Sequence, residues 1–358
     1  MWWVNVMFLG CLVLASCKQQ GPTVIESSKG IIRYARHFSL VQDGRGFRLS
    51  LSTGQQYLLL EHGVQAPDSV TVIRIPVSRV VCSATTQLPL FSLTGSADAI
   101  VAFAHTAYVY DEIIRRRIRD DLVVDVGGPG GLNEEAVLAL QPDLILADRS
   151  MALSERLTRR WVTITAMEAE EAHPLGRAEW IRLGGVLTGR TNEADSIFQE
   201  VERRYLSIAS RSAREEGRPS VLTGIPYGGT WYLPGGGSFM TRLLRDAGYD
   251  QAWPLVPEKV VVPMGLETVM EAAHRSDHWI GVGAVRSVEE LIALEPRLNR
   301  VGALRSGSVF AYDRRTNAFG GNDYFEGAVV RPDLLLQDLV RIRHDSSDHL
   351  TYYRRIGR

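Results

Sequence analysis

The sequence predicts an α/β fold: two Rossmann-like α/β lobes joined by a long helix, with a small N-terminal β extension. Short apolar runs alternate with helix-like stretches from Arg79 to Glu168, and the same alternation resumes at Ser220. A long amphipathic stretch lies between them. Strands that alternate with helices predict βαβ units around a parallel sheet. The length of 358 residues suffices for two such lobes.

The first residues have the pattern of a secretion signal. The apolar run Val6–Ala15 is too short to span a bilayer and suits a signal-peptide h-region. It ends in "LASC" (Leu14–Cys17), which resembles the lipobox of bacterial lipoproteins. This resemblance implies a signal peptide over residues 1–17 and a lipid on Cys17. The alternatives are a plain secretory signal peptide and a buried strand. "MWWVN" contains no Lys or Arg, so the positive n-region usual in signal peptides is missing.

The segments after the signal differ in composition. Residues 18–30 are polar and indicate a tether, and residues 31–76 are expected to form the β extension. Short alternating runs predict its strands: "FRLSL", "QYLLLEHG" and "VTVIRIP". No later run is long enough to span a membrane, so we expect a periplasmic protein held at a bacterial membrane by lipid alone.

Lobe one is expected over residues 77–172. Apolar runs bounded by turn signals predict its strands: "RVVCSA", "AIVAFA", "LVVDVG", "DLILAD" and "WVTITA". The glycine-rich "GGPGG" (Gly127–Gly131) can present N–H groups to an anion, but it lacks the dinucleotide-binding spacing. A tight turn is the simpler interpretation.

The connecting helix is expected over residues 173–218. Its apolar residues recur at three- and four-residue spacing, which predicts an amphipathic helix: Ile197, Phe198, Val201, Tyr205 and Ile208. Three glycines in its earlier part allow a break: Gly184, Gly185 and Gly189.

Lobe two is expected over residues 219–345, followed by a tail over residues 346–358. "SVLTGIPYG", "HWIGVG" and "SVFAYD" predict its strands. An internal echo indicates duplication, because Glu135 precedes Asp143 by eight residues and Glu267 precedes Asp277 by ten, each acid leading to an apolar strand.

Several function classes are disfavoured. The formal net charge of −1 argues against nucleic acid as a partner. The chain lacks the G-x-S-x-G, P-loop and H-E-x-x-H motifs. His274 and His278 are four residues apart, but the chain is expected to leave a helix and enter a strand between them, which does not suit a metal site. We therefore expect no catalytic residue, no metal and no cofactor, and we expect Cys82 to be a buried thiol.

Aromatic and arginine residues on loops indicate a broad ligand pocket. Ligands of open α/β sheets bind beyond the carboxyl ends of strands, where the aromatic loops should emerge. Packing is the alternative for each aromatic residue taken singly. The expected ligand-binding residues are Thr85, Thr86, Tyr108, Tyr110, Arg149, Tyr227, Trp231, Tyr232, Arg314 and Arg315.

Several phrases, in order, resemble a known family over about residues 30–345. These are "NEEAVLALQPDLILA", "RLGGVLTGRTNEAD", "GGGSFMTRLLRDAGYD" and "GGNDYFEGAVVRPDLLLQDLVRI". Together with the lipobox and the paired lobes, they resemble the helical-backbone (class III) substrate-binding proteins of ABC importers, which bind iron–siderophore complexes, haem or vitamin B12. The start, "IRYARHFSLVQDGRGFRLSL", resembles the version found in Bacteroidetes-type bacteria.

The resemblance implies a function and partners. It implies a monomeric receptor that captures an iron chelate or a corrinoid and delivers it to an ABC permease dimer with its ATPase. It also implies one surface glutamate on each lobe that pairs with permease arginines, and the matching motifs offer Glu135 and Glu267. Glu134 is a close neighbour, and Asn133 can cap a helix whose first turn favours both acids.

Alternatives remain open from the sequence. Arg149, Arg314 and Arg315 favour an anionic iron complex over cobalamin, because guanidinium groups pair bidentately with carboxylates. A lipid-anchored hydrolase with Glu135 and Glu267 as acid and base is a different class, which the missing nucleophile motifs disfavour. A ligand-binding lipoprotein that serves a sensor or an outer-membrane receptor is a third possibility.

Overall fold

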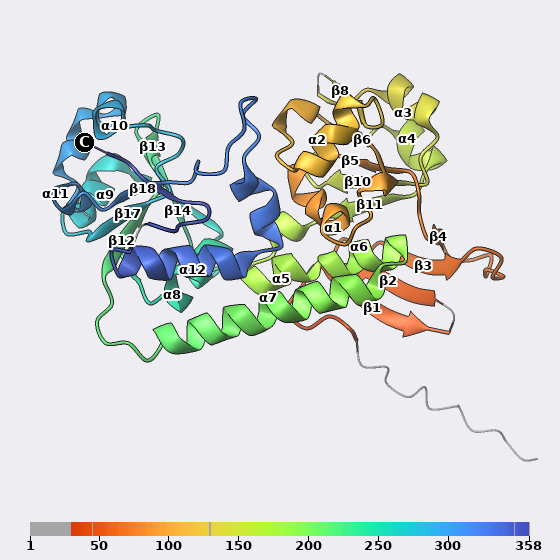
Figure 1. Ribbon diagram of the computed structural model, residues 1–358, viewed down its shortest axis with the longest axis horizontal. Coiled ribbons are helices and arrows are strands. Elements are labelled where there is room, and N and C mark those ends of the chain that lie inside the picture. The colour runs from red at the N-terminus through yellow and green to blue at the C-terminus, as the bar shows by residue number, and fades with distance from the viewer. Residues whose placement is uncertain (1–29, 45, 129, 347, 358) are drawn as a thin grey trace, which may run out of the picture.

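The computed structural model describes residues 30–44, 46–128, 130–346 and 348–357 (Figure 1). The expected signal peptide, the lipid-attachment residue Cys17 and residues 18–29 of the expected tether lie outside the described residues. Within them the predicted fold class is confirmed: two α/β lobes lie side by side, and one long helix runs beneath both (Figure 1).

Lobe one is built on a parallel five-stranded sheet in the order β11-β10-β5-β6-β7. Its strands are β5 (Val80–Cys82), β6 (Ile100–Phe103), β7 (Val124–Asp125), β10 (Leu144–Asp148) and β11 (Thr163–Ala166). Each lies within one of the five predicted apolar runs. The central strands β5 and β10 are buried along almost their whole length, which explains why they lack polar alternation.

Helices and a short hairpin complete lobe one. The helices are α1 (Pro89–Ser92), α2 (Glu112–Arg119), α3 (Glu134–Leu140) and α4 (Glu155–Arg160). Gly127, Gly128 and Gly131 of the "GGPGG" sequence lie in the two-stranded antiparallel hairpin of β8 (Gly127–Gly128) and β9 (Gly131–Leu132), in agreement with the expected tight turn.

Lobe two has a second five-stranded sheet, in the order β15-β12-β17-β18-β19. Its strands are β12 (Ser220–Thr223), β15 (Asp250–Gln251), β17 (His278–Ile280), β18 (Val309–Ala311) and β19 (Arg354–Arg355). A three-stranded antiparallel sheet lies beside it, formed by β13 (Pro226–Tyr227), β14 (Thr230–Pro234) and β16 (Val261–Gly265). The helices are α8 (Phe239–Asp246), α9 (Leu266–Ala273), α10 (Val288–Leu294), α11 (Ala303–Ser306) and α12 (Pro332–Arg343).

The C-terminal residues, expected to be a tail, are part of lobe two. Strand β19 pairs antiparallel with β18. The buried carboxylate of Asp338 accepts hydrogen bonds from the backbone N–H groups of Thr351 and Tyr352 at 2.7 Å each. The composition of the segment does not reveal this, because the anchoring carboxylate lies on α12.

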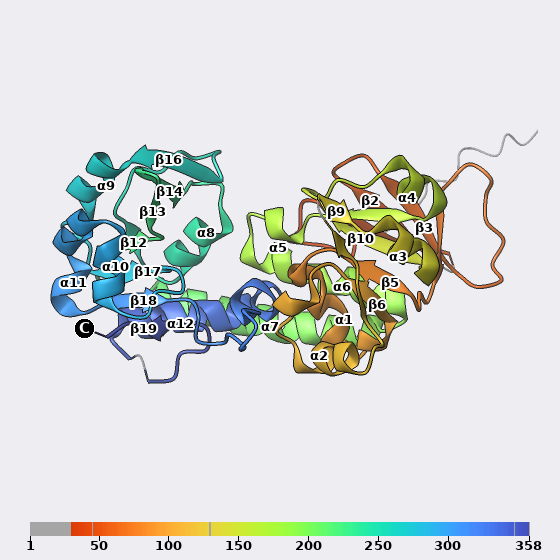
Figure 2. The ribbon, with the colours of Figure 1, turned by 90° about the horizontal axis from the view of Figure 1, so that it is seen from above.

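The connecting region is three helices rather than one: α5 (Pro174–Glu179), α6 (Ile181–Thr188) and α7 (Thr191–Ser212). Gly189 ends α6 with a left-handed φ of 72°, which glycine adopts without strain. The buried face of α7 carries Phe198, Val201 and Tyr205, as the apolar spacing predicts. Helix α7 runs beneath both lobes, and α5 lies between them (Figures 1 and 2).

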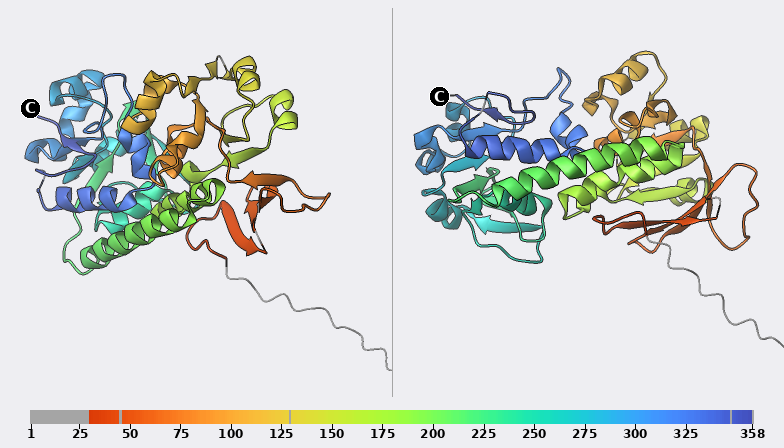
Figure 3. Two further views of the ribbon diagram at one scale, coloured as in Figure 1. Left: turned by 45° about the vertical axis from the view of Figure 1, so that its right-hand side comes forward. Right: turned by 60° about the horizontal axis from the view of Figure 1, so that its bottom comes forward.

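The β extension is a four-stranded sheet of β1 (Phe38–Asp43), β2 (Gly46–Leu51), β3 (Gln56–Glu61) and β4 (Val72–Ile75). It lies at the end of the molecule formed by lobe one (Figures 1 and 3). The buried carboxylate of Glu179 accepts the backbone N–H groups of Arg33, Tyr34 and Ala35 at 2.7–2.9 Å. The start of the extension is therefore fixed to the connecting helices.

Candidate ligand-binding site

A cavity of about 550 Å³ lies between the lobes, a volume in the usual range for small-molecule sites. We call it the aromatic cavity. Residues that follow β5, β12, β17 and β18 reach it, so it lies at the carboxyl ends of strands in both sheets, as expected. Its lining residues are Thr85, Thr86, Ala169, Arg177, Thr223, Gly224, Tyr232, Pro234, Phe239, Met240, Ile280, Gly281, Tyr312, Tyr324, Phe325, Val329 and Tyr353.

Four aromatic side chains form one wall. The rings of Tyr312 and Tyr324 stack with centroids 4.9 Å apart and an interplanar angle of 17°. Phe325 packs edge-on to both, and Tyr353 packs edge-on to Tyr324. Burial raises the pKa of Tyr324 to about 12, so its phenol is neutral at physiological pH. The wall is an uncharged aromatic surface on which a planar or apolar ligand can stack.

One cation faces this wall. Arg177, on α5, is the only charged residue among those that line the aromatic cavity. Its guanidinium lies 3.5 Å from the centroid of the Phe239 ring and donates to the carbonyl oxygens of Ala169 and Glu171. Burial lowers the pKa of Arg177 to about 10, which still leaves it protonated at neutral pH. No carboxylate lines the cavity, so it favours an anionic ligand.

Two hydroxyl groups add polar contacts on the lobe-one and lobe-two sides. The Thr86 hydroxyl donates to Oε1 of Glu168 at 2.5 Å, so its oxygen lone pairs remain available as acceptors. Glu168 is buried, and burial raises its pKa. Across the cavity, the buried Oγ1 of Thr223 has no hydrogen-bond partner among the described residues. A ligand that reaches both hydroxyls satisfies groups that the protein alone leaves open.

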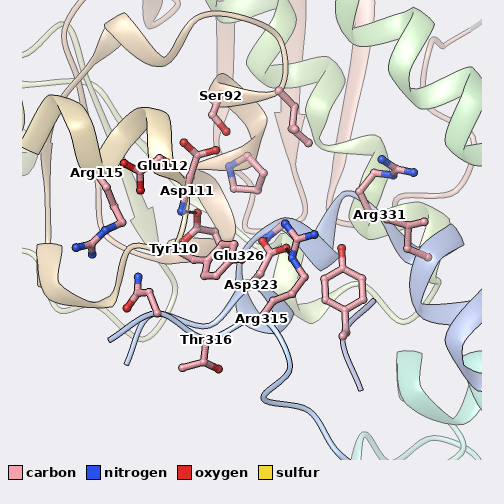
Figure 4. Close-up of a pocket in the computed structure, with 16 residues that line it drawn as sticks. Ser92, Tyr110, Asp111, Glu112, Arg115, Arg315, Thr316, Asp323, Glu326 and Arg331 are labelled. Atoms are coloured by element: carbon pink, nitrogen blue, oxygen red, sulfur yellow. Dashed lines mark hydrogen bonds and ion pairs between the residues drawn. The ribbon is translucent and has the colours of Figure 1, made fainter. Parts of the chain in front are cut away.

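A second cavity, of about 530 Å³, lies between the lobes, and most of the residues that line it are polar or charged (Figure 4). We call it the polar cavity. Tyr110 and Arg315 line it, with the Arg315 guanidinium 5.3 Å from the centroid of the Tyr110 ring. Arg315 also pairs with Asp323 at 2.7 Å, so its charge is already partnered inside the protein.

The structure thus divides the residues expected to bind ligand. Thr85, Thr86 and Tyr232 line the aromatic cavity, and Tyr110 and Arg315 line the polar one. The remaining five lie elsewhere: Tyr108, Arg149, Tyr227, Trp231 and Arg314.

Burial, exposure to solvent or an ion pair describes where each of these five side chains lies instead. Trp231 is 0% exposed and donates its indole N–H to the carbonyl of Thr223, so it belongs to the core. Tyr227 is 81% exposed on β13, and Tyr108 and Arg314 are also exposed. Arg149 pairs with Glu170 at 2.9 Å, beside a different cavity near the β extension.

Sequence reasoning missed the residues that define the aromatic cavity. Arg177 lies in "GRAEW", which resembles an ordinary helix face, and only the position of α5 between the lobes brings it to the ligand side. Phe239, Tyr312 and Tyr324 stand in the quoted phrases "GGGSFM", "SVFAYD" and "GGNDYFE". Their positions after glycine-rich turns and a strand were the available signal.

The two expected docking glutamates occupy equivalent positions. Glu135 lies in the first turn of α3, whose N-cap Asn133 accepts the N–H of Ala136, and Glu267 lies in the first turn of α9. Their side chains are 77% and 79% exposed. Each pairs with an arginine of its own lobe, Glu135 with Arg156 at 2.7 Å and Glu267 with Arg297 at 2.6 Å.

The described residues contain no group of three or more His, Cys, Asp or Glu side chains placed to hold a metal ion. Among the helices described, none is long and apolar enough to cross a membrane. Cys82 is buried in β5, and burial raises its pKa, so its thiol is protonated.

Comparison with known proteins agrees with this architecture. An uncharacterized lipoprotein of Methanocaldococcus jannaschii is 22% identical over 317 residues, which cover 82% of this chain and 73% of that protein. A periplasmic heme-binding protein from Pseudomonas aeruginosa has the same fold, with a TM-score of 0.58 and 17% identity over 79% of this chain and 99% of that one.

Two further solved structures share the fold. The vitamin B12-binding protein BtuF of Vibrio cholerae matches with a TM-score of 0.55 and 13% identity, over 76% of this chain and 99% of that one. An ABC-type Fe3+-hydroxamate transport protein from Saccharomonospora viridis matches with a TM-score of 0.55 and 20% identity. The match covers 76% of this chain and 94% of that one. Residues 80–316, more than half of this chain, match the sequence family described as periplasmic binding protein. The chain therefore belongs to the periplasmic binding protein family.

Proposed function

We propose that this protein captures an iron complex, a ferric siderophore or haem, in the aromatic cavity and delivers it to an ABC permease. The observation that carries the proposal is the cavity itself: an aromatic wall facing a single arginine, at the strand ends of two lobes, in a periplasmic binding protein. The named functions of the solved relatives, which include heme and Fe3+-hydroxamate proteins, support the ligand class.

The charge of the cavity favours an anionic complex. Arg149, Arg314 and Arg315 do not line the aromatic cavity, so these arginines do not favour an iron complex there. Arg177 takes their place, because its guanidinium can pair with a carboxylate or an enolate oxygen of a chelate. Cobalamin is the second candidate, supported by the apolar wall and by the vitamin B12-binding relative.

Delivery requires a docking face. We assign it to Glu135 and Glu267, whose exposed carboxylates lie on different lobes. Exposed ion pairs contribute little stability, so Arg156 and Arg297 can give way to arginines of a permease dimer at small cost. The separation of these two acids on two lobes suits orientation of a docking surface better than an acid and base that must converge on one atom.

The anchor completes the proposed function. A lipid on Cys17 would hold the protein at a membrane in the periplasm, and the relative named as a lipoprotein supports this assignment. We propose that the protein works as a monomer with one ligand between its lobes.

A titration tests the ligand class. Protein beginning at residue 18 is titrated with ferrichrome, ferric citrate, haemin and cyanocobalamin while tryptophan fluorescence is followed. The indoles of Trp231 and Trp279 donate to the carbonyls of Thr223 and Gly224, which line the aromatic cavity, so they report on its occupancy. Micromolar or tighter binding of an iron complex supports the proposal. Cobalamin alone favours the second candidate, and the absence of binding to all four contradicts the ligand class.

A further inference from the structure

One segment of lobe two makes direct contact with lobe one. We call residues 312–331, between β18 and α12, the bridging segment. It donates from Nδ2 of Asn317 to the carbonyl of Val109 at 2.8 Å, and its Phe325 carbonyl accepts from the Thr85 hydroxyl at 3.0 Å. The Arg115 guanidinium of lobe one also lies 4.5 Å from the centroid of the Phe319 ring. The bridging segment thus joins lobe two to lobe one through hydrogen bonds and a cation–π contact.

Glu326 contributes two hydrogen bonds to this contact. Its Oε2 accepts the backbone N–H of Tyr110 at 2.7 Å, and its Oε1 accepts that of Asp111 at 2.8 Å. These amides immediately precede α2, so the carboxyl group lies at the positive end of that helix (Figure 4). Glu326 is only 2% exposed, and these N–H groups have no other hydrogen bond among the described residues. Separation of the lobes at this point breaks both bonds together.

The bridging segment separates the two cavities. Its residues Tyr312, Tyr324 and Phe325 line the aromatic cavity, whereas Asp323 and Glu326 line the polar cavity. Glu326 therefore directly follows two residues of the aromatic wall, and its bonds fix where that wall lies relative to lobe one.

We propose that Glu326 is a positioning residue, a clasp that holds the aromatic wall against lobe one and so sets the lobe arrangement in which ligand binds. The role in ligand retention rests on the proposed function. The clasp itself is a property of the ligand-free protein, and it can be measured without any ligand.

The surroundings of Glu326 make the clasp sensitive to protons. Burial raises its pKa to about 8, and the nearby carboxylates of Asp111 and Asp323 act in the same direction. The hydrogen bonds from Tyr110 and Asp111 act in the opposite direction and are outweighed. The other charged groups that face the polar cavity are Glu112 and Arg115 of α2, Arg315, which pairs with Asp323, and Arg331, which pairs with Asp333.

The sign of the pH effect follows from linkage. In an open arrangement the carboxyl group is hydrated and its pKa returns toward the ordinary value of 4.5. The clasped state has the higher pKa, so it takes up a proton and is favoured by acid. Its advantage is lost as the pH rises through about 8. Between pH 6.5 and 9 the ratio of clasped to open molecules is expected to fall by roughly 30-fold.

The test measures the distance between two spin labels, one on each lobe, by double electron–electron resonance spectroscopy. The labels are attached at Ala139→Cys in α3 and Glu271→Cys in α9, both exposed positions, in the full chain with Cys11→Ser and Cys17→Ser. Cys82 is buried and does not react. We expect Glu326→Ala to shift the distance distribution toward open molecules at pH 6.5. We expect the parent to make the same shift at pH 9, and Glu326→Gln, which cannot titrate, to give the same distribution at both pH values.

Matched controls make each outcome decisive. Glu112→Gln removes a carboxylate from the same cavity without touching lobe two, so it should behave as the parent does. Circular dichroism establishes that each variant is folded. If Glu326→Ala does not fold, the comparison of the parent with Glu326→Gln at the two pH values decides alone. The proposal is overturned if Glu326→Ala has the same distance distribution as the parent. It is also overturned if the distribution of Glu326→Gln changes with pH as much as that of the parent. A failed ligand titration leaves this measurement intact, so the two proposals fail separately.

Discussion

The Arg177 guanidinium lies 3.5 Å from the centroid of the Phe239 ring and so joins α5, in the connecting region, to α8 of lobe two. The contact holds the one cation among the lining residues of the aromatic cavity, and no carboxylate is among those residues. A cation–π contact supports the guanidinium without placing a negative charge in the cavity. The protein thus keeps a positive charge available where an anionic ligand can use it.

Replacement of Arg177 should weaken the binding of anionic complexes. Arg177→Gln removes the charge but keeps a polar side chain. The loss of one charge-assisted hydrogen bond is worth about 1.5–3 kcal/mol, or roughly 10- to 150-fold in the dissociation constant. Titration with haemin and with ferric citrate measures this. Arg314→Gln, an exposed arginine outside both cavities, is the control and should bind as the wild type does. Equal affinities of Arg177→Gln and wild type would remove Arg177 from the site.

Charge reversal at the docking acids should separate transport from binding. Glu135→Lys with Glu267→Lys should abolish uptake of haem iron by cells that carry the permease and the ATPase, because like charges then face each other across the interface. The affinity of the purified protein for haemin should be unchanged, since neither residue lines a cavity. Glu134→Lys tests the choice between neighbouring acids and should retain uptake. A loss of haemin affinity in the double variant is the result that refutes the docking assignment.

Acid should destabilise the protein through His173. Its Nδ1 accepts the N–H of Leu175 at the start of α5, and burial lowers its pKa to about 4. Because the folded pKa lies below the unfolded value, this stability is present above pH 6.5 and is lost as the pH falls toward 4. The loss should be about 1–2 kcal/mol, since the ring is partly exposed to solvent.

Urea unfolding at pH 7.5 and pH 4.5 checks this expectation. His173→Asn keeps a capping acceptor that does not titrate. The free energy of unfolding of this variant should therefore fall by about 1–2 kcal/mol less than that of the wild type between the two pH values. An identical fall in both proteins would show that other groups control the acid response.

Because α6 packs closely on α1, any side chain at Gly184 should lower the stability of the protein. A Cβ at Gly184 would lie 2.4 Å from the carbonyl oxygen of Leu90, which is backbone and cannot rotate away. Gly184→Ala should therefore lower the free energy of unfolding by about 1–3 kcal/mol. Gly30→Ala is the control, because a Cβ there meets no atom within 4 Å and should change stability by less than about 0.5 kcal/mol. Equal stabilities of the two variants would contradict the packing.

The fold was predictable because its signals are local. Each lobe-one strand is a short apolar run between turns, and burial on both faces of a parallel sheet makes such runs continuous. The helix start at Asn133 followed from the capping preference of its side chain. Residues 346–358 were expected to be a tail, but Asp338 of α12 binds the backbone of this segment and its strand β19 pairs with β18.

The ligand site was only partly predictable because it depends on contacts between distant segments. Strand ends correctly pointed to Thr85, Thr86 and Tyr232. Trp231 and Tyr232 are adjacent on β14, and neighbouring strand residues face opposite sides, so both cannot reach one cavity. The expected role of Arg149 depended on a charge that Glu170 already neutralises, a pairing that the sequence does not show.

The most direct test of the central claim is a crystal structure of the protein grown with haemin or, if it binds more tightly, ferric citrate. We predict that the iron complex lies against the ring of Tyr324, with an anionic oxygen within hydrogen-bonding distance of the Arg177 guanidinium. A complex that lies outside the aromatic cavity, in the polar cavity beside Tyr110 and Arg315 or on the outer surface, would contradict it.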